Sequence, residues 1–277
     1  EEMKNRFPQD DSSVPSPDGP YAYLRRFAAG KPQPIFARIP RAGGAEEILL
    51  DANPLAEGKS FFRVGGTSHS PDHKLYAYAV DEQGSEVWKI YVKDLATGQL
   101  LPEPVTDAHG GFTFSPDSQY LFWVWRADNG RPAKIFRRPV RGGAADDVLV
   151  YEEMDIGKFI GVGKTSSGAY ILIRVNDQET SEFHTIPASE PTAAPKLFAP
   201  RKTGELYSPV HFDDRWYILT NANGAVDFKI ATAPLDNTDR EAWQDFSPHQ
   251  PGRYMRVCGR SPTISSGWSA RTRCRES

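Results

Sequence analysis

The sequence predicts an all-β fold: an incomplete β-propeller of about four four-stranded blades, preceded by an N-terminal extension. Short runs rich in Tyr, Ile, Val, Phe and Trp alternate with turns that carry Gly, Asn and Asp, as expected for strands joined by tight turns. Two Ser-Pro-Asp turns, at 70–72 and 115–117, lie 45 residues apart, and each precedes such a run. A helical pattern is confined to the first residues and to 239–245.

The repeat continues for four copies, each with an apolar run, a polar turn and a returning strand. The returning strands align on Ile90, Ile135, Ile186 and Ile230, with spacings of 45, 51 and 44 residues. A repeat near 45 residues is typical of a propeller blade, whose small sheet buries both faces against its neighbours. A β-sandwich with coincidental turn spacing is the alternative, and the matching turns and Ile residues favour the propeller.

The chain divides by composition into three parts. Residues 1–60 are expected to be an extension that leads into the propeller, and 61–255 to be the partial propeller. Residues 256–277 contain five Arg, no Lys, five Ser and one acid, without a visible period, so we expect a disordered tail. A basic interaction arm and translation in a shifted frame both explain this tail, and the abrupt change favours the shifted frame.

Charge and cysteine usage exclude several classes of partner. The 33 basic and 36 acidic residues leave no basic field for nucleic acid or a membrane surface. The longest apolar runs have six residues, far below the roughly 20 that span a bilayer. Cys258 and Cys274 are the two cysteines, so the first 255 residues hold neither a disulfide framework nor a thiolate metal site. We therefore expect a cytoplasmic protein that is not bound to membranes.

One short segment contains the residue types of a catalytic triad. These residues are Ser68, His69, Ser70, Asp72 and His73. Side chains so close in sequence do not readily form a nucleophile, base and orienting acid, so a polar turn is the preferred interpretation. The sequence also has no Gly-x-Ser-x-Gly nucleophile turn. We assign no catalytic residue.

The other candidate residues favour structural roles. The remaining histidines are scattered without a ligand spacing, so no metal site and no cofactor are assigned; they are His109, His184, His211 and His249. The double glycines at 43–44 and 142–143 follow basic runs and are interpreted as turns, because no helix follows. Adjacent acids such as Glu152 and Glu153 are expected in solvated turns. Strand tryptophans are expected to pack between blades, with a channel lining as the alternative; they are Trp88, Trp123, Trp125 and Trp216.

Several ordered blocks carry a family resemblance. They include EEMKNRFPQDDSSVPSPDGPYAYLRRF within 1–41, LLDANPLAEGKSFFRVGG at 49–66, SHSPDHKLYAYAVDEQGSE at 68–86, LTNANGAVDFKI at 219–230 and SPHQPGR at 247–253. In this order they resemble oligopeptidase B, the protease II branch of the prolyl oligopeptidase family of serine peptidases. The resemblance covers Glu1 to about Met255.

The resemblance implies a seven-bladed propeller that covers an α/β-hydrolase domain and restricts it to short peptides cleaved after Lys or Arg. The catalytic Ser, Asp and His of that family lie in the hydrolase domain, so none is transferred to this sequence. We expect the chain to be an inactive, substrate-gating propeller part of such an endopeptidase. Short basic peptides are the expected partners of the full-length family, and self-association through open propeller ends is expected of this chain. A free-standing propeller that binds peptides or proteins without chemistry is the alternative.

Overall fold

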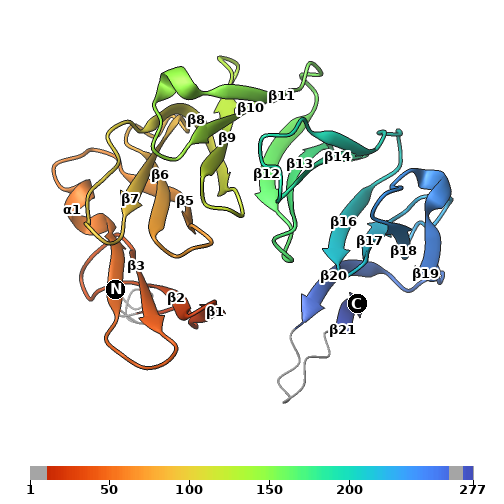
Figure 1. The fold of residues 1–277 in the computed structure, drawn as a ribbon, viewed down its shortest axis with the longest axis horizontal. Helices are drawn as coiled ribbons and strands as arrows, with labels where there is room; N and C mark the ends of the chain where they lie inside the picture. The colour runs from red at the N-terminus through yellow and green to blue at the C-terminus, as the bar shows by residue number, and fades with distance from the viewer. Residues whose placement is uncertain (1–10, 262–270, 277) are drawn as a thin grey trace, which may run out of the picture. The chain divides into compact units, whose positions relative to one another are not determined.

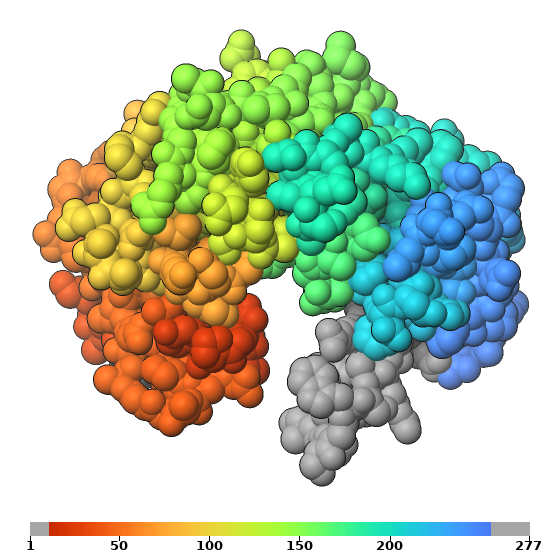
Figure 2. Space-filling view, in the orientation of Figure 1, coloured from red at the N-terminus to blue at the C-terminus, as the bar shows by residue number. Residues whose placement is uncertain are grey.

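The structure, a computed structural model, describes residues 11–261 and 271–276, with side chains for residues 11–255. The regular secondary structure of the described chain consists almost entirely of antiparallel strands (Figure 1). It divides into two compact units: unit 1 comprises 11–69 and 73–110, and unit 2 comprises 70–72 and the residues from 111 onward. Each sheet uses one continuous stretch of sequence, so each colour range stays together in the space-filling view (Figure 2).

Unit 1 contains two meanders in which strands follow one another in chain order. The first sheet has the order β1-β2-β3-β4 and leads into the short helix α1; the second begins with β5, β6, β7 and the first part of β8. The bounds are β1 Ser16–Asp18, β2 Tyr21–Arg26, β3 Ile35–Pro40, β4 Glu47–Asp51, α1 Ala52–Ala56, β5 Arg63–His69, β6 Leu75–Asp81, β7 Trp88–Asp94 and β8 Val105–Phe114.

Unit 2 continues the same pattern. The end of β8 is followed by β9, β10 and β11, and the sheets β12-β13-β14-β15 and β16-β17-β18-β19 come next. The bounds are β9 Tyr120–Arg126, β10 Pro132–Pro139, β11 Val148–Glu152, β12 Phe159–Lys164, β13 Tyr170–Asn176, β14 Ser181–Pro187, β15 Lys196–Ala199, β16 Tyr207–Phe212, β17 Arg215–Thr220, β18 Lys229–Pro234 and β19 Gln244–Ser247. Four-stranded meanders in chain order are the blades that the sequence predicted, so the all-β propeller prediction is confirmed.

The first 60 residues differ from the expected extension. Residues 16–51 form the four-stranded sheet β1 to β4, with the same strand order as the later meanders. A Ser-Pro-Asp sequence at Ser16–Asp18 forms β1, and runs of strand-forming residues such as Tyr21–Arg26 and Ile35–Pro40 follow it. The described chain therefore has a meander before residue 61 in addition to the four expected after it.

The Arg- and Ser-rich tail also differs from expectation. Strands β20 (Met255–Ser261) and β21 (Arg271–Glu276) pair in antiparallel register. Alternate residues 271, 273 and 275 are Arg, which is a period of two that the sequence analysis overlooked. Residues 262–270 and 277 lie outside the described residues, and the tail's dispensability for the fold stays a prediction.

A residue of positive φ lies in the connection between the first and second strand of each meander. These residues are Gly19, His73, Ser118, Gly168 and Asp213. In two of the connections a buried hydroxyl closes the turn: Ser115 Oγ accepts from the backbone N of Tyr120 at 2.9 Å, and Thr165 Oγ1 from that of Tyr170 at 3.1 Å. The Ser-Pro-Asp sequences at 70–72 and 115–117 therefore form structural turns, whereas the one at 16–18 forms β1.

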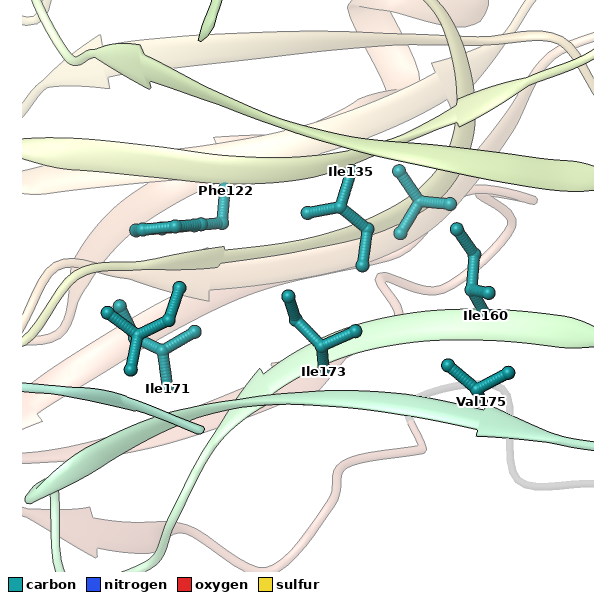
Figure 3. Packing of buried hydrophobic residues seen from close by; sticks show 8 residues of the cluster. Phe122, Ile135, Ile160, Ile171, Ile173 and Val175 are labelled. Atoms are coloured by element: carbon teal, nitrogen blue, oxygen red, sulfur yellow. The ribbon is translucent and has the colours of Figure 1, made fainter. Parts of the chain in front are cut away.

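The four aligned isoleucines are all buried, but one is out of step with the others. Ile135 pairs with Val124 and belongs to the buried cluster shared with the sheet β12 to β15 (Figure 3). Ile186 pairs with Ile171 and belongs to the same cluster from the opposite sheet. The position in β14 that matches Ile135 is Phe183, because the bulge toward the fourth strand follows Ile135 in β10 and Phe183 in β14. Ile186 lies three residues further on, and since side chains alternate between faces, an odd shift reverses the direction.

Apolar side chains form the contact between successive sheets of unit 2. Phe122, Val124 and Ile135 of one sheet lie against branched residues of the next (Figure 3). Those residues are Ile160, Ile171, Ile173, Val175 and Ile186. The contact is dry and aliphatic, so its stability depends on close packing of branched side chains.

Replacing Ile173 with Ala should lower the free energy of unfolding by about 2–5 kcal/mol, because it opens a cavity in this layer. Urea denaturation followed by tryptophan fluorescence measures the loss. The matched control is Ile156→Ala, since Ile156 is 78% exposed, and it should change stability by less than about 0.5 kcal/mol. Equal losses in the two variants would contradict the packing described here.

Candidate functional site

The segment with triad residue types forms the turn between β5 and β6. Ser70 has no exposed surface, and its hydroxyl donates to the carboxylate of Asp72. A catalytic nucleophile must reach the substrate, so this buried hydroxyl serves the turn instead. The sequence interpretation of a polar turn agrees with this geometry.

The two histidines of this segment contact the first sheet of unit 1. His69 Nε2 lies 2.8 Å from Asp18 Oδ2 on β1, and its ring stacks on Tyr23 with centroids 3.7 Å apart. His73 Nδ1 lies 2.7 Å from the Tyr23 hydroxyl. Asp18, Tyr23, His69, His73 and Arg38 form what we call the histidine cluster.

Arg38 of β3 fixes the arrangement of the cluster. Its Nη1 donates to the carbonyl oxygen of His73 at 2.7 Å, and its Nε donates to Glu47 at the same distance. Burial raises the pKa of Tyr23 to about 12, although Arg38 opposes the shift through a hydrogen bond. The hydroxyl of Tyr23 therefore keeps its proton at neutral pH, and it lies within hydrogen-bond distance of His73 Nδ1.

The histidine cluster also explains why residue 19 is a glycine. Gly19 has φ of +53°, and a Cβ atom there would lie 2.4 Å from Nε2 of His73. A side chain at this position would be strained and would displace the imidazole ring. Gly19 thus brings the turn after β1 close to the His73 ring.

A shallow groove of about 500 Å³ adjoins the cluster within unit 1. Its lining includes Ser13, Val14 and Ser16 from the region of β1, residues 67–69 of β5, and Tyr23 and Tyr76. Polar and apolar groups both line the groove, so it offers hydrogen bonds as well as an apolar contact surface.

The histidines outside the cluster lie apart from one another along the chain. His184 contacts Glu182, His211 contacts Ser167, His249 contacts Asp227, and His109 lies in β8. Burial lowers the pKa of His211. Within the described ranges, no group of three or more His, Cys, Asp or Glu side chains is arranged to hold a metal ion.

A second polar cluster, which the sequence analysis missed, connects two sheets of unit 2. Arg201 Nη2 donates to Glu153 Oε2 at 2.6 Å and to Glu182 Oε1 at 3.0 Å. Tyr151 donates to the same Glu153 oxygen. Burial alone would raise the pKa of Glu182, but hydrogen bonds from His184 and Arg201 outweigh it and lower the pKa to about 2.

The acid pairs were expected in solvated turns, and this expectation was wrong for two of them. The Glu153 side chain is 7% exposed and paired with Arg201, and Asp147 is paired with Arg138 and accepts from Trp123 Nε1. Arg201 is 48 residues away from Glu153 in the sequence, so the adjacent acids at 152 and 153 did not indicate this ion pair. The spacing of nine residues between Arg138 and Asp147 recurs between Arg38 and Glu47, and this repeat was available in the sequence.

The strand tryptophans pack in different ways. Trp216 belongs to the buried layer between two sheets of unit 2, as predicted. Trp88 instead lies against its own sheet, because Cβ atoms added at Gly65 and Gly110 would fall within 3.1 Å of its ring. Because glycine has no side chain, Gly65 and Gly110 leave space for the indole ring of Trp88.

Replacing Arg201 with Met should lower the free energy of unfolding at pH 7 by about 3 kcal/mol, because two buried carboxylates lose their cation. The depressed pKa of Glu182 stabilises the fold above the ordinary value of 4.5, and this contribution is lost as pH falls toward 2. The difference between wild type and variant should therefore shrink between pH 5 and pH 3, as urea denaturation at each pH would show. Arg215→Met is the control, since Arg215 pairs with Asp214 at an exposed site, and it should leave stability unchanged. A difference independent of pH would contradict this assignment.

These features define a propeller domain in which the triad residue types of the β5–β6 segment serve a structural turn. None of the helices in the described part of the chain is long and apolar enough to cross a membrane. Residues 1–261 match the family described as prolyl oligopeptidase, N-terminal beta-propeller domain, and the chain belongs to this family. The match includes residues 1–60, in agreement with the sheet found there, and extends six residues beyond Met255.

The chain is similar to one part of several known peptidases. It is 38% identical over 267 residues to dipeptidyl aminopeptidase BI of Pseudoxanthomonas mexicana, covering 90% of this chain and 37% of the relative. It is 31% identical to protease 2 of Moraxella lacunata, over 86% of this chain and 35% of that protein. The structure of oligopeptidase B from Leishmania major matches with a TM-score of 0.88 and 28% identity, over 93% of this chain and 37% of that one. The chain thus spans little more than a third of the length of these relatives.

Proposed function

We propose that this chain is the substrate-gating propeller part of a serine endopeptidase similar to oligopeptidase B, which cleaves short peptides after Lys or Arg. The observation that carries the proposal is the similarity to oligopeptidase B from Leishmania major over 93% of this chain. In this proposal the catalytic groups come from residues outside the present sequence, and the propeller restricts which peptides reach them. The chain alone is then inactive.

Charge supports basic peptides as the substrate class. Residues 1–255 contain 28 basic and 35 acidic residues. A net negative domain attracts cationic peptides over a distance and raises their local concentration. We also propose a cytoplasmic location, because the first 255 residues contain no cysteine.

A second candidate activity follows from the relative with 38% identity, dipeptidyl aminopeptidase BI. Under this proposal the same propeller belongs to an enzyme that removes dipeptides from a free amino end. The two candidates differ in one measurable property: an endopeptidase accepts a blocked amino end, and a dipeptidyl aminopeptidase requires a free one.

A third candidate is a free-standing propeller that binds peptides or proteins without chemistry. We propose in addition that the chain self-associates through sheet faces left uncovered, since Phe246 of β19 is 57% exposed beside Tyr217. Light scattering over a range of concentrations reports this association. A monomer with reproducible peptide affinity would instead favour the free-standing module.

The purified chain should not hydrolyse Arg or Lys ester and amide reporters above the buffer rate, because the triad residue types in its described part form a turn around the buried Ser70 rather than a nucleophile with a base and an oxyanion hole. A fluorophosphonate probe should leave it unlabelled. Turnover that the probe abolishes, in protein free of host peptidase, would overturn the proposal that the chain alone is inactive.

A chimera tests the gating role directly. Residues 1–255 of this chain replace the matching segment of protease 2 from Moraxella lacunata, to which they are 31% identical. The chimera should cleave an amino-blocked Arg reporter and a ten-residue basic peptide, yet leave a folded protein intact. Probe labelling confirms that its nucleophile is active. A labelled chimera that digests folded protein would contradict gating, and one that cleaves only peptides with a free amino end would favour the dipeptidyl activity.

A further inference from the structure

Strand β1 is held to its neighbours by few backbone contacts. Its residues are exposed, and it pairs with β2 alone through three register pairs, one of which involves Pro17. Three register pairs form only a short ladder. Ser13 adds a backbone hydrogen bond to the carbonyl oxygen of Arg25 at 2.8 Å.

A side-chain contact ties β1 to the following sheet. Asp18 lies at the end of β1, and its carboxylate meets His69 Nε2 of β5 at 2.8 Å. Ser13, Val14 and Ser16 line the groove together with residues 67–69 of β5. We call these two segments its walls, and the contact between Asp18 and His69 joins the strands to which they belong or lead.

His69 is the member of the cluster whose surroundings favour a positive charge. A protonated ring forms an ion pair with Asp18, which is stronger than a neutral hydrogen bond. The same ring lies flat on Tyr23 at 3.7 Å, where the electrons of the phenol also favour a cation. Both interactions therefore strengthen when His69 binds a proton.

His73 lies beside His69 in the cluster. Its Nδ1 lies 2.7 Å from the Tyr23 hydroxyl. The Arg38 guanidinium bonds to its carbonyl oxygen, and the His69 ring lies 5.3 Å away. The charged or titratable groups around the cluster are Asp18 of β1, Tyr21, Tyr23 and Arg25 of β2, Arg38 of β3, Arg41 after it, Glu47 of β4, His69 of β5, His73 of the following turn and Tyr76 of β6.

We propose that the Asp18–His69 contact is a pH-sensitive closure that draws β1 onto β5 and narrows the groove when His69 is protonated. Histidine ordinarily changes charge near pH 6.5, so the contact is strongest below that value and weakens as pH rises. The groove is then open at pH 8 and closed at pH 6. This inference is independent of the proposed peptidase function, because both walls and both residues lie in unit 1.

Hydrogen exchange of the full chain tests the closure. After correction for intrinsic rates, amides of residues 12–18 should be about threefold better protected at pH 6.0 than at pH 8.0, the size expected for a partly exposed ion pair. Asp18→Asn should abolish this difference. Asp128→Asn, which removes an exposed carboxylate in unit 2, and His73→Gln should retain it.

Three results would overturn the proposal. They are equal protection of the wild type at both pH values, an unchanged difference in Asp18→Asn, and loss of the difference in His73→Gln. The last result would assign the pH response to His73. Far-ultraviolet circular dichroism of each variant confirms that its strands are intact before exchange is compared.

Discussion

The fold of unit 2 depends on the burial of apolar sheet faces against the next sheet. In unit 2, Phe122 and Ile135 of one sheet and Ile171 and Ile173 of the next form a layer with almost no exposed surface. Because successive side chains point to opposite faces, such a layer fixes the register of every strand that contributes to it. A residue of positive φ recurs in the connection between the first two strands of each meander.

Local patterns were sufficient to predict the meanders and their turns. A Ser-Pro-Asp turn and the strand that follows it lie within about ten residues, so their signal is continuous in the sequence. The first sheet was missed because Pro15 and Pro17 interrupt its opening strand and mask the period. Ile186 was misaligned because it lies three residues after the matching position, Phe183, and satisfies the same hydrophobic pattern while facing the opposite way. The presence of each strand could therefore be predicted from the sequence. The sheet face to which a side chain points could be assigned only from the pairing register of the strands in the structure.

The polar clusters were harder to predict because their members come from distant segments. Glu153, Glu182 and Arg201 lie on different strands or connections, and only the packing of two sheets brings them together. Asp81 is a local contrast, since its carboxylate accepts from backbone N–H groups of Gln83, Gly84 and Glu86 within one turn. Burial would raise the pKa of Asp81, but these donors outweigh it and lower the pKa. Polar residues in this fold thus serve turns and sheet contacts before any chemistry.

A filtering domain needs rigidity and charge rather than a particular set of reactive side chains. Packing of alternating apolar residues can be satisfied by many combinations of Ile, Val, Leu and Phe, provided that volume and facing direction are kept. This accounts for a TM-score of 0.88 at 28% identity with oligopeptidase B from Leishmania major. The same tolerance leaves exposed positions such as Asp18 free to vary, so a pH response can be added at β1 without disturbing the buried layers. The groove beside the histidine cluster is therefore a place where related propellers can differ in behaviour while sharing one fold.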